Sequence, residues 1–141
     1  MSRNYFSEFH LHIVWHTKES YPISTEEIEQ FAHRALRQKI VAWSGAFVHE
    51  INGTPTHVHL AVTLAPTILV SEFIGQLKGS SSHEVNLRLG RKVLEWQTGY
   101  GVVNFGTKDM EWVLQYIRNQ KEHHAQGDIH DRLERISADH A

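Results

Sequence analysis

Two stretches of this chain alternate apolar and polar residues with period two, and this alternation most restricts the possible folds. In residues 56–64 the apolar side chains share one strand face: Val58, Leu60, Val62 and Leu64. His57 and His59 fall on the opposite face, about 7 Å apart along the strand. Residues 5–16 alternate in the same way and place His10 and His12 opposite their own apolar face. Both segments therefore predict strands of a sheet with one apolar side.

The remaining segments predict two more strands and three helices. A capping box at Ser24 and Glu27 predicts a helix to about Trp43. A strand over residues 46–51 is expected to turn at Asn52–Gly53. The other expected elements are a helix from Pro66 to Lys78 that is interrupted at Gly79–Ser82 and resumes to Leu89, a strand from Tyr100 to Phe105, and a helix from Lys108 to about His124.

The order β-α-β-β-α-β, followed by a helix that carries Tyr116, predicts an α+β fold. The expected architecture is ferredoxin-like, an antiparallel sheet with helices on one face. The first and third strands are neighbours in such a sheet, so His10 and His12 approach His57 and His59 if the parity of the strands matches. We expect one domain over residues 1–126 and a polar tail over 127–141 with room for one more short helix.

Composition narrows the possible chemistry. The chain of 141 residues has no cysteine, which excludes disulfides, zinc thiolate sites and thiol catalysis. We find no signal-peptide pattern and no long apolar run, so a cytoplasmic protein with no membrane partner is expected.

Charge is distributed unevenly along the chain. The net charge of −2 argues against a nonspecific nucleic-acid binder. A local basic stripe can nevertheless hold a phosphate backbone, with a solvated helix face as the alternative. The candidate DNA-binding residues of this kind are Lys78, Arg88, Arg91 and Lys92.

His57 and His59 are candidate metal ligands, because two neutral imidazoles on one strand face can converge on one ion. Two imidazoles and an amide oxygen leave coordination positions for phosphate oxygens and water. This mixed donor set suits Mg²⁺ or Mn²⁺ better than a closed zinc site. Structural or surface histidines are the alternative for an isolated pair.

Tyr116 and Gln120 lie four residues apart in a helical pattern, which puts them on one helix face. A phenol with a pKa of about 10 needs activation before it attacks a phosphorus atom. The resulting phosphotyrosine ester would retain the energy of the broken bond, so that rejoining needs no ATP. Gln120 offers a neutral oxygen ligand. The alternative is an outward-facing tyrosine and an exposed glutamine, but together with the histidine pair these residues suggest phosphodiester chemistry on nucleic acid.

Five segments carry a resemblance to a known family. In chain order they are His12–Lys18, His57-Val58-His59, Leu77-Lys78-Gly79-Ser80-Ser81, Trp96–Tyr100 and Tyr116-Ile-Arg-Asn-Gln120. Together they resemble the single-tyrosine HUH transposases of the insertion-sequence 200/605 class, whose relatives include those associated with repetitive extragenic palindromes. The likeness runs from about residue 5 to residue 124.

This resemblance implies a metal-dependent DNA transposase that cleaves and rejoins single-stranded DNA beside hairpins. Tyr116 would be the nucleophile that forms a 5′-phosphotyrosine intermediate. His57, His59 and Gln120 would bind the Mg²⁺ or Mn²⁺, and Lys78 would contact DNA. A homodimer is implied, in which the tyrosine helix of one copy can complete the site of the other.

Departures from the family pattern leave alternatives open. Thr56 stands where many members have Asp, Glu19–Ser20 replace an aromatic-basic pair, and Gly101 replaces a second aromatic. The alternatives are a non-catalytic single-stranded nucleic-acid-binding domain, a domesticated non-mobile relative and a histidine-based phosphohydrolase. Histidines on the central strands disfavour a base-stacking domain, which has paired aromatics there. Ala61 stands where the phosphohydrolase needs a third alternating histidine.

Overall fold

The computed structural model describes residues 5–22, 25–127 and 129–137. Four strands form one sheet in the order β2-β3-β1-β4, and every neighbouring pair is antiparallel. The strands are β1 (His10–His16), β2 (Ala46–Thr54), β3 (His57–Leu64) and β4 (Gly101–Phe105). The predicted α+β class and the pairing of the first strand with the third are confirmed.

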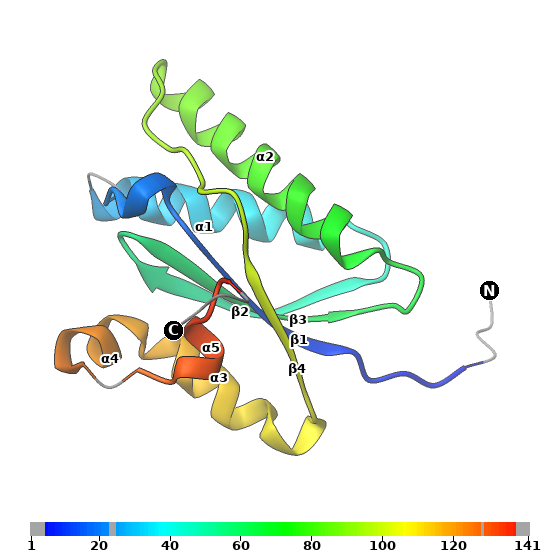
Figure 1. Ribbon diagram of the computed structural model, residues 1–141. Coiled ribbons are helices and arrows are strands. Elements are labelled where there is room, and N and C mark those ends of the chain that lie inside the picture. The colour runs from blue at the N-terminus through cyan, green and yellow to red at the C-terminus, as the bar shows by residue number, and fades with distance from the viewer. Residues whose placement is uncertain (1–4, 23–24, 128, 138–141) are drawn as a thin grey trace.

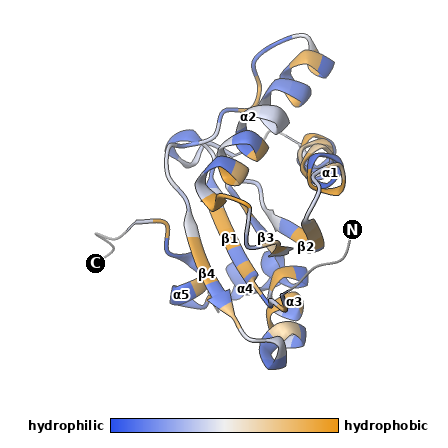
Figure 2. Ribbon diagram, turned by 90° about the vertical axis from the view of Figure 1, so that its right-hand side faces the viewer, coloured by the Kyte–Doolittle hydropathy of each residue, from blue (hydrophilic) through white to orange (hydrophobic). Residues whose placement is uncertain are grey.

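The helices lie on both faces of the sheet. On one face lie α1 (Glu26–Val41) and α2 (Val70–Leu89), while α3 (Met110–Arg118), α4 (Gln120–Gln126) and α5 (Asp131–Glu134) lie on the other (Figures 1 and 2). Short 3₁₀ helices, η1 (Lys18–Ser20) and η2 (Thr107–Asp109), follow β1 and β4. Within the described ranges, no helix combines the length and apolar character needed to cross a membrane.

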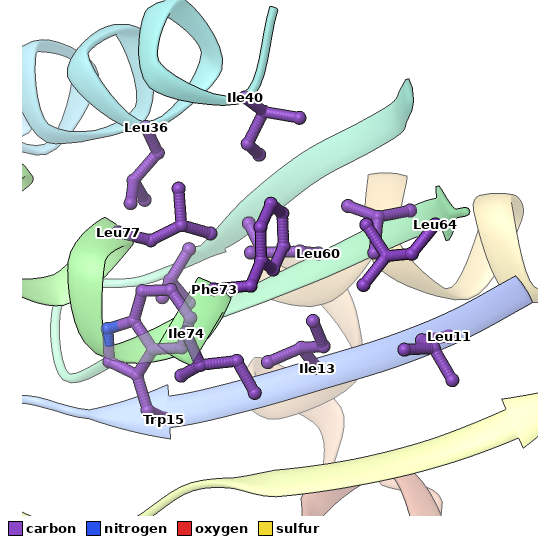
Figure 3. Packing of buried hydrophobic residues seen from close by; sticks show 12 residues of the cluster. Leu11, Ile13, Trp15, Leu36, Ile40, Leu60, Leu64, Phe73, Ile74 and Leu77 are labelled. Carbon is purple, nitrogen blue, oxygen red and sulfur yellow. The ribbon is translucent and has the colours of Figure 1, made fainter. Parts of the chain in front are cut away.

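The main core fills the space between the sheet and the first two helices (Figure 3). The alternating apolar residues of β1 and β3 face α1 and α2, as the period of two requires. Fully buried examples include Ile13 and Leu60 from the strands and Leu36 and Leu77 from the helices. Full burial of each such side chain contributes about 1.5–3 kcal/mol. This layer fixes which side of β3 remains for polar residues.

The opposite face of β1 and β3 carries the histidines. In the antiparallel register Val14 pairs with His59, and His16 pairs with His57. A small apolar cluster of Ala61, Val113 and Ile117 packs α3 onto this face. The parity of the two strands therefore places the histidines of both on one side, beneath the C-terminal helices.

The predicted turn at Asn52–Gly53 is wrong, because β2 continues to Thr54 and the chain turns at residues 55–56. Gly53 pairs with Val58 in the ladder. A Cβ atom at Gly53 would lie 2.2 Å from the His57 carbonyl oxygen. This glycine thus allows a close approach of two strands, which the sequence pattern does not distinguish from a turn.

The predicted interruption of the second helix at Gly79–Ser82 is also wrong. Helix α2 begins at Val70 instead of Pro66 and runs without a break to Leu89. The hydroxyls of Ser81 and Ser82 donate to the Lys78 carbonyl within the helix. Because these hydroxyls satisfy themselves on the preceding turn, the serines do not break the helix.

Other boundaries also differ from the expected ones. Strand β1 begins at His10 instead of Tyr5. The helix expected over residues 108–124 is divided, because α3 ends at Arg118 and Asn119 (φ −99°, ψ 23°) separates it from α4. The expected cap Ser24 lies outside the described residues, and the Thr25 side chain accepts a hydrogen bond from the Ile28 N–H.

Candidate metal and tyrosine site

His57 and His59 lie side by side on β3 with their ring centroids 5.2 Å apart. His59 is fully buried and His57 is nearly so. Each uses its Nδ1 atom for a contact that fixes the ring. The hydroxyls of Thr54 and Thr56 both lie 3.0 Å from Nδ1 of His57. Nε2 of His12 lies 2.7 Å from Nδ1 of His59.

Two residues from the C-terminal helices meet these imidazoles. Nε2 of His124, on α4, lies 3.0 Å from Nε2 of His57. An oxygen of Glu134, on α5, lies 3.1 Å from Nε2 of His59, 3.6 Å from that of His57 and 3.4 Å from that of His124. One donor atom from each residue lies within 4.8 Å of the other three, so this His/Glu cluster could hold a metal ion.

The surroundings keep His57, His59 and Glu134 in their metal-binding protonation states. Burial lowers the pKa of His57 to about 3 and also lowers the pKa of His59. Burial acts to raise the pKa of Glu134, but the hydrogen bond to His59 and the contact with Tyr116 outweigh it and hold that pKa at about 2. Neutral imidazoles and an ionised carboxylate are the forms that bind cations.

Tyr116 lies against this cluster instead of pointing to solvent. Its side chain is buried, and its ring centroid lies 6.1 Å from that of His59. The hydroxyl donates to the Glu134 carboxylate and accepts from the His130 N–H at 2.8 Å. The ring is stacked with Trp112 and His123. Burial, followed by the hydrogen bond to Glu134, raises the pKa of this phenol above its ordinary value.

Gln120 opens α4 and is completely buried. Its Nε2 donates to the Tyr116 carbonyl at 3.3 Å. Its Oε1 is buried and meets no donor in the described part of the chain. A buried amide oxygen without a donor is costly unless another partner satisfies it. An amide oxygen and the imidazoles of His57 and His59 have the donor chemistry of a divalent cation.

The basic residues expected to bind DNA do not meet this cluster. Lys78 and Arg88 belong to α2, which covers the other face of the sheet, and Arg91 and Lys92 follow that helix. The Lys78 ammonium donates to the carbonyls of Gln97 and Gly99 at 2.6 and 2.9 Å, and burial lowers its pKa.

Two of the other basic side chains in this group, those of Arg88 and Lys92, have partners of their own. Arg88 lies over the Phe31 ring at 4.7 Å, and Lys92 forms an ion pair with Glu95 at 3.2 Å. Arg91 is exposed on the loop that follows α2.

Sequence reasoning missed His124 and Glu134. A signal for His124 was present, since it lies four residues after Gln120 and eight after Tyr116, on one helical face. The signal for Glu134 is weaker. Leu133 is an apolar residue in a polar stretch, and its burial places the neighbouring Glu134 at the site.

Comparison with known proteins gives consistent matches. The profile of the family described as "Transposase IS200 like" matches residues 5–120. The ISDra2 transposase TnpA of Deinococcus radiodurans is 24% identical over 124 residues, which cover 84% of this chain and 88% of the relative. The transposase for insertion sequence element IS200 of Salmonella typhimurium is 28% identical over 100 residues, which cover 67% of this chain and 65% of the relative.

Two solved structures share the fold. A candidate transposase from Deinococcus radiodurans superposes with a TM-score of 0.66 at 23% identity, over 85% of this chain and 96% of that protein. A REP-associated tyrosine transposase bound to a REP hairpin superposes with a TM-score of 0.63 at 17% identity, over 92% of this chain and 75% of that protein.

Proposed function

Because this chain belongs to the IS200-like transposase family, we propose that it cleaves and rejoins single-stranded DNA beside hairpins. The observation that carries the proposal is the position of the Tyr116 hydroxyl. This hydroxyl is joined to the histidine cluster through one carboxylate, that of Glu134. A nucleophile and a candidate cation site in contact form the minimal arrangement for metal-assisted phosphoryl transfer.

In the proposed reaction the Tyr116 oxygen attacks the phosphorus atom of a DNA phosphodiester. A bond forms between this oxygen and phosphorus, the bond to the 3′ oxygen breaks, and the 3′ oxygen leaves as a hydroxyl after taking up a proton. The Glu134 carboxylate already accepts the hydrogen bond of the phenol, so it would receive the phenolic proton as the bond to phosphorus forms and the phenol becomes acidic. That proton can then pass to the leaving 3′ oxygen. The product is a 5′-phosphotyrosine, which a 3′ hydroxyl can attack in the rejoining step.

Mg²⁺ or Mn²⁺ is the proposed cofactor, held by His57, His59 and the Oε1 of Gln120. When bound, the cation would polarise the scissile phosphate and stabilise the negative charge on the leaving oxygen. The contacts that fix the two rings support this ligand set. Thr54 and Thr56 hold the His57 ring, and His12 holds the His59 ring. Thr56 stands where many members have Asp, and two hydroxyls here occupy the Nδ1 side of the imidazole.

The proposed partner is single-stranded DNA with hairpin ends. The REP-associated relative, whose structure contains a REP hairpin, supports this choice. Lys78, Arg88, Arg91 and Lys92 are proposed to bind the phosphate backbone across α2 and the loop after it. A homodimer is proposed as the working assembly. Tyr116 and His59 lie together within one chain, so the geometry of the site does not reveal the number of copies. The test is therefore the molecular mass in solution with and without DNA.

A covalent-adduct assay tests the proposal. The protein is incubated with Mn²⁺ and hairpin-bearing single strands from the flanks of its gene, labelled at the 3′ end. The expected result is a labelled protein band that Tyr116→Phe abolishes. Tyr21→Phe is the matched control, because Tyr21 is 70% exposed. Absence of adduct on every flank would support the non-catalytic binding domain, and cleavage that survives Tyr116→Phe would support a hydrolase.

A further inference from the structure

The cluster contains more metal ligands than the proposed reaction uses. Besides His57 and His59, it includes the Nε2 of His124 and a carboxylate oxygen of Glu134. The donor atoms come from three elements, β3, α4 and α5. They therefore meet only when the C-terminal helices pack on the sheet.

Four of the distances between these donor atoms are close to those of four-coordinate geometry. Ligand atoms about 2.0–2.1 Å from a tetrahedral ion lie about 3.3–3.4 Å apart. The distance between His57 Nε2 and His124 Nε2 is 3.0 Å, and Glu134 Oε1 lies 3.1, 3.6 and 3.4 Å from the Nε2 atoms of His59, His57 and His124. The full set lies within 4.8 Å, so an ion at the centre would draw the histidines closer together.

The outer contacts also have the form of a metal site. A ligand imidazole usually has its second nitrogen held by a neighbouring polar group, which fixes the ring and its tautomer. Nδ1 of His57 contacts two threonine hydroxyls, and Nδ1 of His59 contacts His12. Both histidines consequently present Nε2 to the centre of the cluster.

We propose that, in the absence of DNA, His57, His59, His124 and Glu134 form a closed four-coordinate site that prefers Zn²⁺ to Mg²⁺. Three imidazole nitrogens and one carboxylate oxygen favour a borderline ion, whereas Mg²⁺ takes an octahedral shell of oxygen ligands. This inference concerns the same histidine pair and rests on the function proposed above. It adds a second ligand set, in which His124 and Glu134 stand in place of Gln120 and the DNA phosphate.

Metal binding by the purified full chain tests the inference without any DNA. Affinity for Zn²⁺ is measured by competition with a chromophoric chelator, and Co²⁺ is used as a spectroscopic probe. We expect tight Zn²⁺ binding, weak Mg²⁺ binding, and the intense visible absorption of four-coordinate Co²⁺. Equal affinity for Zn²⁺ and Mg²⁺, or the weak spectrum of six-coordinate Co²⁺, would overturn the proposal with the unmodified protein alone.

Substitutions then separate the two ligand sets. His124→Ala and Glu134→Gln are each expected to lower Zn²⁺ affinity by more than about 100-fold, since even outer-shell partners account for 10–100-fold. Gln120→Ala should leave Zn²⁺ affinity within a few-fold of the unmodified protein. His83→Ala is the surface control, because His83 is exposed on α2 across the sheet. Unchanged Zn²⁺ affinity in both His124→Ala and Glu134→Gln contradicts the inference.

The two proposals fail in different ways. If the Mn²⁺-dependent adduct forms but the Zn²⁺ affinity does not depend on His124 and Glu134, the closed site is wrong and the transposase reaction stands. If Zn²⁺ binds as expected but no adduct forms on any flank, the reaction is wrong and the metal site stands.

Discussion

The Tyr116 hydroxyl donates a hydrogen bond to the carboxylate of Glu134, a residue 18 positions further along the chain. The other oxygen of this carboxylate lies 3.1 Å from Nε2 of His59. One acidic side chain thus joins the phenol to the imidazoles. Changes that move the C-terminal segment are therefore expected to alter both the tyrosine and the metal ligands.

Gly101→Ala is expected to displace that segment. A Cβ atom at Gly101 would lie 1.8 Å from the Arg135 carbonyl oxygen and 3.1 Å from the Val14 side chain. Because this backbone cannot yield locally, residues 131–135 must shift and withdraw Glu134. We expect faster hydrogen exchange of α5 and a Zn²⁺ affinity close to that of Glu134→Gln.

The matched control for this substitution is Gly106→Ala, because no atom lies within 4 Å of a Cβ built at Gly106. This variant should exchange and bind metal like the unmodified protein. If Gly101→Ala leaves the exchange of α5 unchanged, the contact between β4 and the C-terminal segment does not hold α5 in place.

His12→Ala should weaken metal binding although His12 is not a ligand. Its Nε2 lies 2.7 Å from Nδ1 of His59, and both side chains are fully buried. Loss of this contact frees the His59 ring and is expected to lower metal affinity 10–100-fold. The measurement is chelator competition, with thermal unfolding of the metal-free protein as the check on folding. His10→Ala is the comparison, since His10 contacts Thr63 and Thr107 instead; an equal loss in both variants would argue against a specific role for His12.

Acid should weaken the fold partly through His33. Burial, followed by the nearby charges of Lys121 and Arg37, lowers the pKa of His33 to about 4. A Glu29 oxygen lies 3.9 Å from Nε2 of His33. The unfolded chain takes up this proton near pH 6.5, and the folded protein only near pH 4. The contribution of His33 to stability is therefore fully present above pH 6.5 and is lost as the pH falls to about 4.

The full loss is on the order of 3 kcal/mol, because each pKa unit corresponds to about 1.4 kcal/mol. Denaturant unfolding between pH 7 and 4 measures it, and His33→Gln should show a shallower decline than the unmodified protein. Parallel declines for the two proteins would mean that His33 does not carry this pH dependence.

Arg91 and Lys78 should respond differently to substitution. Arg91 is exposed, so Arg91→Ala should weaken hairpin binding with an unchanged unfolding temperature. It should also reduce the slope of log K against log salt by about 0.7–1. The Lys78 ammonium donates to two backbone carbonyls, so Lys78→Met should destabilise the protein by about 1–3 kcal/mol. Binding titrations at several salt concentrations, together with unfolding curves, distinguish a contact to DNA from a contact that stabilises the fold. An unchanged salt slope in Arg91→Ala would remove Arg91 from the proposed DNA surface.

The strand faces could be predicted from the sequence because the period of two follows from backbone geometry alone. It predicted that Leu60 and His59 lie on opposite faces of their strand. It also led to the pairing of the first and third strands. The prediction of a turn at Asn52–Gly53 was wrong because the same dipeptide also suits a tight contact between strands, as at Gly53. Helix α2 passes through its serines because the preceding turn accepts their hydroxyls, a choice that local patterns do not settle.

Only part of the candidate site could be predicted from the sequence, for a related reason. His57, His59, Tyr116 and Gln120 lie in regular segments with clear spacing, whereas Glu134 reaches the cluster through a four-residue helix in a polar stretch. Its position depends on the burial of Leu133 and on contacts with distant strands. Such tertiary packing leaves almost no periodic trace in the sequence.

The register of β1 against β3 has a consequence for folding accuracy. A shift of one residue in either strand would turn its imidazoles toward Leu36 and Phe73 and its leucines toward Glu134. Such a misaligned sheet would bury less apolar surface, and it would also leave buried polar groups without partners. The histidines on one face of β1 and β3 therefore help to specify a single alignment of the central strands. This effect on folding does not depend on any ion or DNA.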